Sequence, residues 1–242
     1  NNQHPGDPNN PGIGFSSGSP GHRVFAAASY RLDYLKFGAT TLSVFWEGHT
    51  EGNASYVFSG DLNGDGGTSN DLIYIPRDTS EMNFQTFISG GRTYTAAEQA
   101  QAWNAYIEQD SYLSKRRGSY AERGGVFLPM VFRTDLSISQ ELFKNIGGKR
   151  NALQFRADFL NFANLLNSDW GVGQRLVSGT FSGVAQPLIV PSSTQGGPAD
   201  AQGRAQYRLR VVNNELLSKS LEQTAGLSDV YRIQFSLTYS FN

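Results

Sequence analysis

The chain has 242 residues, a formal net charge of −1 and no cysteine. A net charge near zero gives no basic field for nucleic acid, and the lack of cysteine excludes disulfide frameworks and thiolate metal sites. No run of about 18 apolar residues occurs, so no transmembrane helix is predicted. A membrane-spanning β-strand is apolar on one face only, and such strands are compatible with the mean hydropathy of −0.40.

The first 21 residues are rich in Gly, Pro, Asn and Ser, which is the composition of a loop. They lack the charged and apolar regions of a signal peptide. We therefore expect residues 1–21 to be an extracellular loop, and we expect the chain to begin in the middle of a larger fold.

Five segments of about 10–14 residues alternate large apolar with polar side chains, a period of two that predicts long β-strands with two unlike faces. In the last of them, Phe235 and Tyr239 fall on the apolar face and Arg232 and Gln234 on the polar face. Strands of this length suit a tilted crossing of a bilayer, which takes about 9–11 residues. The predicted strands are residues 22–35, 38–48, 128–142, 151–163 and 230–242, the last being the C-terminal closing strand.

The connections between these strands alternate in length. Short turns lie inside the predicted strand hairpins 22–50 and 128–164, whereas the segments 51–127 and 165–229 are long. Outer-membrane barrels have short periplasmic turns and long extracellular loops, so we expect both long segments outside the cell. Residues 205–212 also alternate, but a single extra crossing would break this pattern, and we expect them to be part of a folded loop.

One stretch of the first long loop, residues 94–109, has a helical pattern. Thr95 followed three positions later by Glu98 is a capping box, which predicts the start of a helix. Tyr106 lies on the apolar side of this helix, and Gln99 is expected on the solvated side. The sequence thus predicts a short surface helix within the loop.

Three stretches resemble segments of the C-terminal barrel portion of TonB-dependent outer-membrane receptors, most closely the Oar-like branch. They are GDLNGDGGTSNDLIYIPRD at 60–78, YLSKRRGSYAERGGVFLP at 112–129 and LQFRADFLNFANLLNSDWG at 153–171. The terminal LTYSFN, with Tyr239 and Phe241, resembles the aromatic-ended signal that the barrel-assembly machinery recognises.

The resemblance implies an all-β fold: an antiparallel transmembrane β-barrel segment, about the last five strands of a larger, roughly 22-stranded barrel. It implies the bacterial outer membrane as the location and energised uptake of an unidentified substrate as the function. The implied partners are outer-membrane lipid, a plug domain and the remaining strands of the same receptor, the TonB complex and the barrel-assembly machinery. A structural, adhesive or secretion-linked barrel without import activity is the alternative, and a soluble calcium-binding β-sandwich is a weaker one because the strands are long.

A candidate calcium site lies in the first long loop. Asp61, Asn63 and Asp65 occupy alternate positions before a glycine, as in the first half of an EF-hand loop. The match then fails, because position twelve is Leu72 rather than Glu, although Asp71 or its neighbour Asn70 could substitute. The competing interpretation is a turn rich in Asp and Asn that binds no ion.

Charged residues recur on the polar faces as three Arg-x-Asp pairs. An Arg that faced lipid would cost about 2–4 kcal/mol at the midplane, so these groups are expected to face the lumen. There they would either hold a plug or guide a ligand, or form a ladder of cross-strand ion pairs in the wall. The residues expected on the lumen face are Arg31, Asp33, Arg133, Asp135, Arg156, Asp158, Arg232 and Gln234. The residues expected to contact lipid include Phe155, Phe159, Phe235 and Tyr239.

The main basic cluster, Lys115 to Arg117 with Arg123, could contact phosphates or an acidic cargo, but a solvated or internally paired cluster is favoured. The histidines, at positions 4, 22 and 49, show no spacing typical of catalytic pairs or metal centres. No enzymatic activity is predicted.

Overall fold

The computed structural model comprises two compact units, each described by itself. The loop unit consists of Asn1–Ser19, Gly52–Leu128 and Arg175–Glu222, and the sheet unit of Pro20–Glu51, Pro129–Gln174 and Gln223–Asn242. The residues described are 2–16, 18–19, 21–34, 38–149, 151–177, 183–191 and 197–241. The predicted turn at 35–37 therefore lies outside the described residues.

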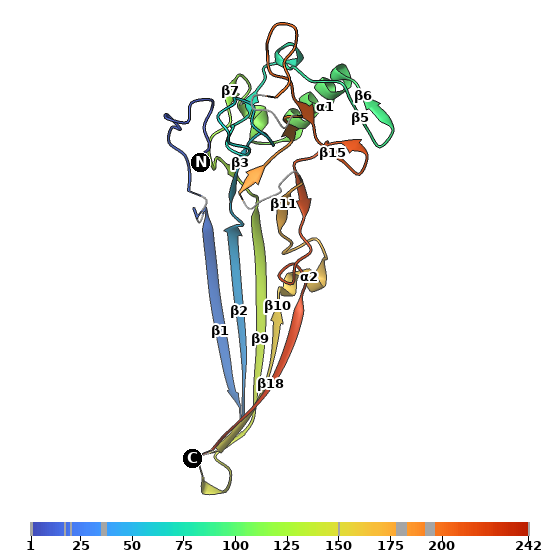
Figure 1. Cartoon of the computed structure of the whole chain (residues 1–242). Helices are drawn as coiled ribbons and strands as arrows, with labels where there is room; N and C mark the ends of the chain where they lie inside the picture. Colours follow the sequence, from blue (N-terminus) through green and yellow to red (C-terminus); the bar gives the residue numbers. More distant parts are fainter. Residues whose placement is uncertain are drawn as a thin grey trace. The chain divides into compact units, whose positions relative to one another are not determined.

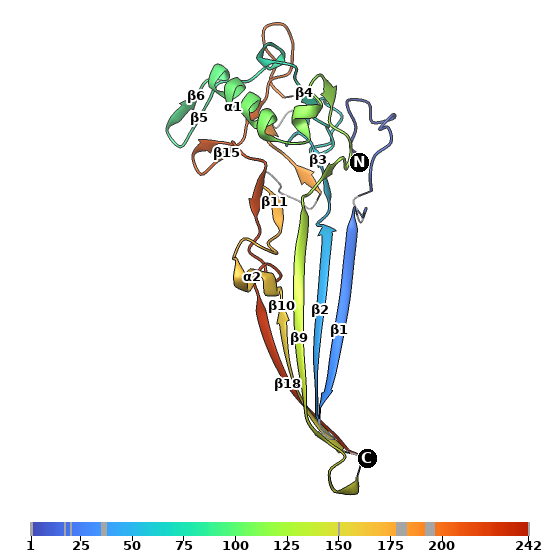
Figure 2. The ribbon, with the colours of Figure 1, turned by 180° about the vertical axis from the view of Figure 1, so that it is seen from behind.

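The sheet unit is built on one antiparallel sheet of five long strands (Figure 1, Figure 2). The strands run in the order β1-β2-β9-β10-β18. Their bounds are Arg23–Tyr34 for β1, Gly38–Thr50 for β2, Met130–Lys144 for β9, Asn151–Leu160 for β10 and Arg232–Phe241 for β18. The five long strands expected from the alternation are confirmed, as is the all-β, antiparallel fold class.

The pairing of residues between neighbouring strands places polar side chains mostly beside polar ones on one face of the sheet and apolar side chains mostly beside apolar ones on the other. Ser43 pairs with Ser29 on one side and with Ser137 on the other. Arg156 pairs with Ser236, whereas Phe235 pairs with Ala157. Because side chains alternate along a strand, Arg156 and Phe235 lie on opposite faces of the sheet, as predicted.

A β-bulge interrupts the pairing of β9 with β10. Leu153 pairs with Phe143, and the next residue, Gln154, pairs with Glu141, so Leu142 is the extra residue. A bulge of this kind breaks the alternation of the strand without ending it. This is why β9 continues two residues beyond the expected end at position 142.

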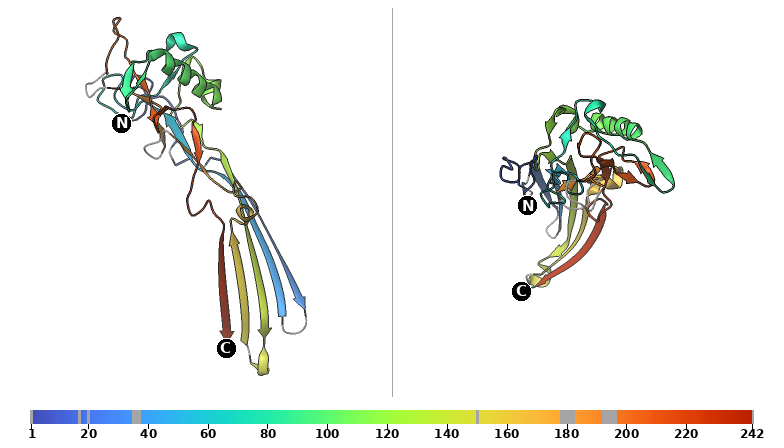
Figure 3. Two further views of the ribbon diagram at one scale, coloured as in Figure 1. Left: turned by 90° about the vertical axis from the view of Figure 1, so that its right-hand side faces the viewer. Right: turned by 45° about the horizontal axis from the view of Figure 1, so that its top comes forward.

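The short turns and the chain end lie at the same end of the sheet. Tyr34 pairs with Gly38 at that end, and Asn151 pairs with Phe241. The long segments leave from the other end, where Thr50 pairs with Met130. The predicted alternation of short and long connections is therefore present, and Figure 3 shows the strands curving together.

Strand β10 ends at Leu160, earlier than the expected end at 163. Asn161 has a φ of 51°, in the left-handed region, and the short helix α2 (Phe162–Leu166) follows it. This left-handed residue turns the backbone out of the extended conformation and into α2, so β10 ends before it. The turn between β9 and β10 contains a 3₁₀ helix, η3 (Ile146–Gly148).

The loop unit consists of many short elements around one helix, α1 (Ala96–Gln109). Two 3₁₀ helices, η1 (Thr79–Glu81) and η2 (Leu113–Lys115), flank it in sequence. No helix of the described residues is long and apolar enough to cross a membrane. The short strands are β3 Asn53–Tyr56, β4 Tyr74–Ile75, β5 Phe87–Ser89, β6 Arg92–Tyr94, β7 Ser119–Tyr120, β8 Val126–Phe127, β12 Val184–Ala185, β13 Leu188–Ile189, β14 Arg208–Leu209, β15 Val211–Val212 and β16 Glu215–Leu216.

Short strand pairs organise these segments. Strands β13 and β14 pair with each other, as do β15 and β16, so the alternating residues 205–212 belong to the folded loop as expected. Strand β12 pairs in parallel with β3, which also pairs with β8. In addition, β11 (Gln174–Leu176) pairs with β17 (Leu221–Gln223).

The helix α1 begins where the sequence predicts and packs its apolar residues in the core, but Gln99 lies in the core as well. The Thr95 side chain accepts a hydrogen bond from the backbone N–H of Glu98, which confirms the predicted start. Trp103 and Tyr106 are fully buried in the core of the loop unit. Gln99 is also fully buried, which corrects the expectation that it is solvated. Its amide N–H donates to backbone carbonyls, and its side-chain oxygen accepts from a backbone N–H of β14, so burial leaves no polar group unpaired.

Candidate functional site

One face of the five-stranded sheet is a continuous surface of exposed apolar side chains. Phe235 is 65% exposed and stacks on Phe155 with ring centroids 5.8 Å apart. Trp46 stacks on Phe132 in the same way, at 5.7 Å. Contiguous apolar surfaces of this size indicate a partner or a membrane. The exposed residues of this face are Val24, Tyr30, Leu32, Leu42, Val44, Phe132, Ile138, Phe155, Ile233, Phe235, Leu237, Tyr239 and Phe241.

The last strand contributes the aromatic residues predicted as an assembly signal. Tyr239 and Phe241 stack on one another at 5.7 Å and are both exposed on the apolar face. They pair across the sheet with Leu153 and Asn151 of β10. Their recognition by the assembly machinery stays a prediction.

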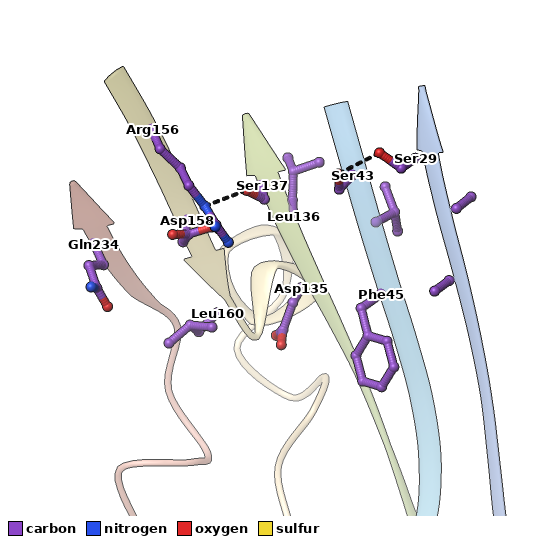
Figure 4. A pocket seen from close by; sticks show the side chains of 13 residues that line it. Ser29, Ser43, Phe45, Asp135, Leu136, Ser137, Arg156, Asp158, Leu160 and Gln234 are labelled. Atoms are coloured by element: carbon purple, nitrogen blue, oxygen red, sulfur yellow. Dashed lines mark hydrogen bonds and ion pairs between the residues drawn. The ribbon is translucent and has the colours of Figure 1, made fainter. Parts of the chain in front are cut away.

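The opposite face is polar, and its side chains connect neighbouring strands. The hydroxyls of Ser29 and Ser43 are 2.9 Å apart, and the Arg156 side chain donates to the Ser137 hydroxyl at 3.1 Å (Figure 4). These groups line a groove of about 570 Å³ together with Asp135 and Gln234. Phe45 and Leu160 also line the groove, so it combines polar and apolar groups. Its hydroxyl, amide and charged groups are suited to water or to polar ligands rather than to lipid.

Two of the three Arg-x-Asp pairs are ion pairs within their own strand. Arg31 lies 3.1 Å from Asp33, and Arg156 lies 2.8 Å from Asp158. Arg31 also reaches Glu141 on β9 at 3.0 Å, past the intervening strand β2. The expected cross-strand pairing is therefore present for Arg31 with Glu141, but each Arg-x-Asp pair itself lies within one strand, because residues two apart share a face and are close enough to bond directly.

The third pair does not form. Arg133 is mostly buried and bonds to Glu51 at 3.3 Å and to Asp229 at 3.2 Å. Asp135 instead accepts a hydrogen bond from the backbone N–H of Asn161 at 2.8 Å. Both residues lie on the polar face, as expected, but they also hold connecting segments against the end of the sheet and so are not free groups of an open lumen.

Asp229 is the buried anion in this cluster. Burial raises its pKa, but the backbone N–H groups of Gly173 and Gly226, the Thr224 side chain and Arg133 outweigh that effect. The two backbone bonds are 2.9 Å and 2.6 Å long. The pKa of Asp229 therefore lies below its ordinary value, and the carboxylate is charged at neutral pH.

Arg232 and Gln234 lie on the polar face, as predicted. Arg232 pairs with Leu160 and Gln234 with Asp158 across β10 and β18. Arg232 lines a smaller cavity that also contains Arg133 and Asp135. Among the described residues, no ion pair of Arg232 is found.

The predicted calcium loop forms a tight turn closed by its own side chains. The Asp61 carboxylate accepts hydrogen bonds from the backbone N–H groups of Gly64 (2.7 Å) and Gly66 (2.8 Å). The Asn63 side chain accepts from the N–H of Asp65 at 2.9 Å. These oxygens therefore shape the turn, which is the role of Asx residues in turns.

A histidine from the start of the chain completes this site, and sequence reasoning missed it. Ligand atoms of His4, Asp65 and Asp71 lie within 4.8 Å of one another. His4 is brought there by backbone pairing, since its N–H donates to Asn70 at 2.9 Å and its carbonyl accepts from Leu72 at 3.0 Å. Its Nε2 lies 2.8 Å from the Asp65 carboxylate.

Two buried oxygens at this site have no hydrogen-bond partner. They are Oδ1 of Asp71 and Oδ1 of Asn70, on side chains that are only 4% and 3% exposed. Burial raises the pKa of Asp71, and the nearby Asp65 and Asp61 raise it further against the opposing backbone N–H bonds. By contrast, the Gly67 N–H and His4 hold the pKa of Asp65 below its ordinary value.

Two members of the basic cluster, Arg116 and Arg117, are paired within the loop unit, and Lys115 is exposed, so the cluster is in part paired and in part solvated, as favoured from the sequence. Arg116 lies 3.4 Å from Glu122 and its guanidinium stacks 4.0 Å from the Tyr112 ring. Arg117 donates to the Asn104 side chain at 2.9 Å. These cations are thus engaged within the loop.

Comparison with protein-family models, with curated proteins and with solved structures gave no match. The residues described above and their geometry are therefore the basis for a functional assignment.

Proposed function

We propose that the chain forms part of the wall and the outer loops of a TonB-dependent receptor in the bacterial outer membrane. The observation that supports this most directly is the exposed apolar face shared by all five strands, with the charged residues confined to the other face. Lipid covers the apolar face, and the polar face lines the lumen.

Strand length favours lipid over a second protein sheet. Strand β1 has 12 residues, which at about 3.3 Å per residue gives about 40 Å. Tilted by about 40°, a strand of that length spans the hydrocarbon core of about 30 Å. Sandwich strands that pack on another sheet are usually about 5–6 residues long.

The two edge strands require partners. Strands β1 and β18 lie at the edges of the five-stranded sheet. In hydrocarbon each unpaired backbone group costs several kcal/mol, so open edges are not stable there. We therefore propose further strands of the same receptor beside both edges, closing a barrel of about 22 strands.

The receptor function is supported by the resemblance of three segments to the Oar-like branch and by the polar groove. Arg156, Asp158 and Gln234 line this groove on the lumen side, where a plug domain or a passing substrate would meet them. Uptake would be energised through the TonB complex. The substrate class is left open, because neither the groove nor the loops select one.

Single cysteines introduced into a cysteine-free form of the full-length protein test this proposal, and residues 1–242 contain no native cysteine to remove. Ser218→Cys in the loop unit and Lys149→Cys in the β9–β10 turn are both at exposed positions. A membrane-impermeant maleimide should label Ser218→Cys on intact cells and should label Lys149→Cys only after cell lysis. Labelling of Lys149→Cys alone on intact cells would contradict the orientation.

A second measurement separates a receptor from a structural or adhesive barrel. In-cell crosslinking of the full-length protein to TonB should give a specific adduct if the protein is an import receptor. A correctly oriented protein that gives no adduct would support the structural alternative.

A further inference from the structure

We infer that the turn at residues 61–71 binds a hard divalent cation of the Ca²⁺ class. The protein ligands are the carboxylates of Asp65 and Asp71 and the side-chain carbonyl of Asn70. His4 is a positioning residue that orients Asp65. The site lies within the loop unit, so it is independent of the proposed receptor function.

Buried oxygens without a protein partner are available to bind a cation. Asp71 uses Oδ2 to accept the backbone N–H of Leu62 at 2.7 Å, and its Oδ1 has no partner in the described residues. Oδ1 of Asn70 also has no hydrogen-bond partner in the described residues. A buried polar atom without a partner destabilises the fold. Of the two, Asp71 belongs to the group whose ligand atoms lie within 4.8 Å of one another, and a cation there would give its free oxygen a partner.

The charges at the site are also uncompensated. The carboxylates of Asp61, Asp65 and Asp71 form no ion pair with any lysine or arginine of the described residues. Elsewhere in the loop unit, Asp200 closes a similar turn by accepting backbone N–H bonds, but it lies 2.8 Å from Arg204. The turn at 61–71 lacks such a cation, and a bound metal ion would supply it.

Hydrogen bonds assign His4 the role of a donor rather than a ligand. The N–H of Gly6 donates to Nδ1 of His4 at 3.1 Å, so Nδ1 has no proton. A ring proton is then on Nε2, which lies 2.8 Å from the Asp65 carboxylate and 3.0 Å from the Asn70 amide nitrogen, and we assign the carboxylate as its acceptor because the amide nitrogen is itself a donor. Asn70 Nδ2 donates to the same oxygen at 3.0 Å. Such donors fix the orientation of a ligating carboxylate.

The chemistry of the remaining atoms selects the class of cation. Carboxylate and amide oxygens suit Ca²⁺, Mg²⁺ or Mn²⁺, whereas Zn²⁺ and Cu²⁺ favour imidazole or thiolate. Ca²⁺ takes about 6–8 oxygens at about 2.3–2.6 Å in flexible geometries, and backbone carbonyls or waters commonly complete its shell. A loop that offers three side-chain oxygens therefore fits Ca²⁺ best.

The glycine at position 67 makes the arrangement possible. A Cβ at Gly67 would lie 2.1 Å from the Asn70 Oδ1, so no larger residue allows the Asn70 side chain to pack there. The close approach places the Asn70 amide against Asp65. Gly67 thus leaves room for the whole Asn70 amide, whose carbonyl oxygen we assign as a ligand.

Calorimetric titration of Ca²⁺ into the metal-stripped full-length protein tests the site. We expect the wild-type protein to bind Ca²⁺, and we expect Asp65→Asn and Asp71→Asn to lose that binding. Asp200→Asn is the matched control and should bind as the wild type does. Hydrogen exchange across residues 61–72 should be slower in Ca²⁺ than in a chelator, and only for the proteins that bind. Unchanged exchange in α1 shows that a variant is folded.

Two substitutions at His4 test its role. His4→Ala should weaken Ca²⁺ binding by about 10–100-fold. His4→Gln, whose amide N–H can also donate to Asp65, should restore most of the affinity.

Three results would overturn the assignment. One is wild-type exchange across residues 61–72 that is the same in Ca²⁺ and in chelator. Another is an Asp71→Asn variant that binds Ca²⁺ like the wild type. The third is a site that responds to Zn²⁺ but not to Ca²⁺ and requires His4, because the imidazole would then be a ligand.

Discussion

The loop unit and the sheet unit use the same kinds of large apolar residue in opposite ways. In the loop unit, Tyr56, Ile73 and Trp103 are fully buried in a common core. In the sheet unit, Tyr30 and Leu237 are 69% and 67% exposed. The loop unit supplies its own core, whereas the apolar face of the sheet has to be covered by something that the described residues do not provide.

The polar residues show the same contrast. Gln99 in the loop unit is buried and fully hydrogen-bonded within a protein core. On the sheet, Arg156 and Asp158 remain accessible on a face lined with serines. A soluble β-sandwich would place its polar residues outside and its aromatic residues inside. In this sheet most exposed aromatic residues lie on the face that the proposed barrel would turn toward lipid, whereas Phe25 and Phe45 lie on the polar face.

The largest expected effect is in the core of the loop unit. Trp103 is fully buried and stacks on Tyr106 at 5.1 Å. Trp103→Ala should therefore lower the stability of the loop unit by about 3–5 kcal/mol. Hydrogen exchange of α1 in the full-length protein measures the loss. Trp170→Ala, at a residue that is 52% exposed, is the control and should change stability by less than about 0.5 kcal/mol. Equal effects would contradict a self-contained core.

A charge on the apolar face of the sheet gives the next largest effect. Leu237→Arg should cost about 2–4 kcal/mol if residue 237 faces lipid near the midplane. Its neighbour Thr238 points to the other face, so Thr238→Arg should stay within about 0.5 kcal/mol. Urea unfolding of the full-length protein in lipid vesicles compares the two. If both variants were equally stable, the apolar face would not be in hydrocarbon.

The smallest of the three effects concerns Asp229 and depends on pH. Asp229→Asn removes a charged partner of Arg133 and should cost about 1.5–3 kcal/mol at neutral pH. Because the folded pKa of Asp229 lies below the unfolded value of about 3.9, this stabilisation is complete above that value and disappears as pH falls through the folded pKa. Unfolding at pH 7 and at pH 3 measures it. A difference that persisted undiminished at the lower pH would rule out the carboxylate as its source.

Much of the sheet could be predicted because the alternation of apolar and polar residues lies within each strand. From Phe155 to Phe159 and from Ile233 to Tyr239 the alternation has no exception, and each strand therefore fixes its own faces. The start of α1 was likewise predictable from Thr95 and Glu98. The burial of Gln99 could have been inferred too, since it lies one helical turn before Trp103.

The contacts that could not be predicted join residues far apart in sequence. Arg133 is two positions from Asp135, and this spacing suggested a pair, yet its partners Glu51 and Asp229 are 82 and 96 residues away. His4 and Asp65 are 61 residues apart and meet only because of backbone pairing beside Asp71. No local pattern contains such a contact.

The most direct test of the membrane wall is the environment of each residue along β18. Single cysteines at positions 232–241 of the full-length protein in lipid vesicles, each carrying a nitroxide label, would be exposed to oxygen and to a water-soluble nickel chelate. Oxygen collects in hydrocarbon, and the chelate stays in water. We expect oxygen to reach the labels at 233, 235, 237 and 239 and the chelate to reach those at 234, 236 and 238. Equal access of the chelate to both sets, or access with the two sets exchanged, would contradict a lipid-facing apolar surface.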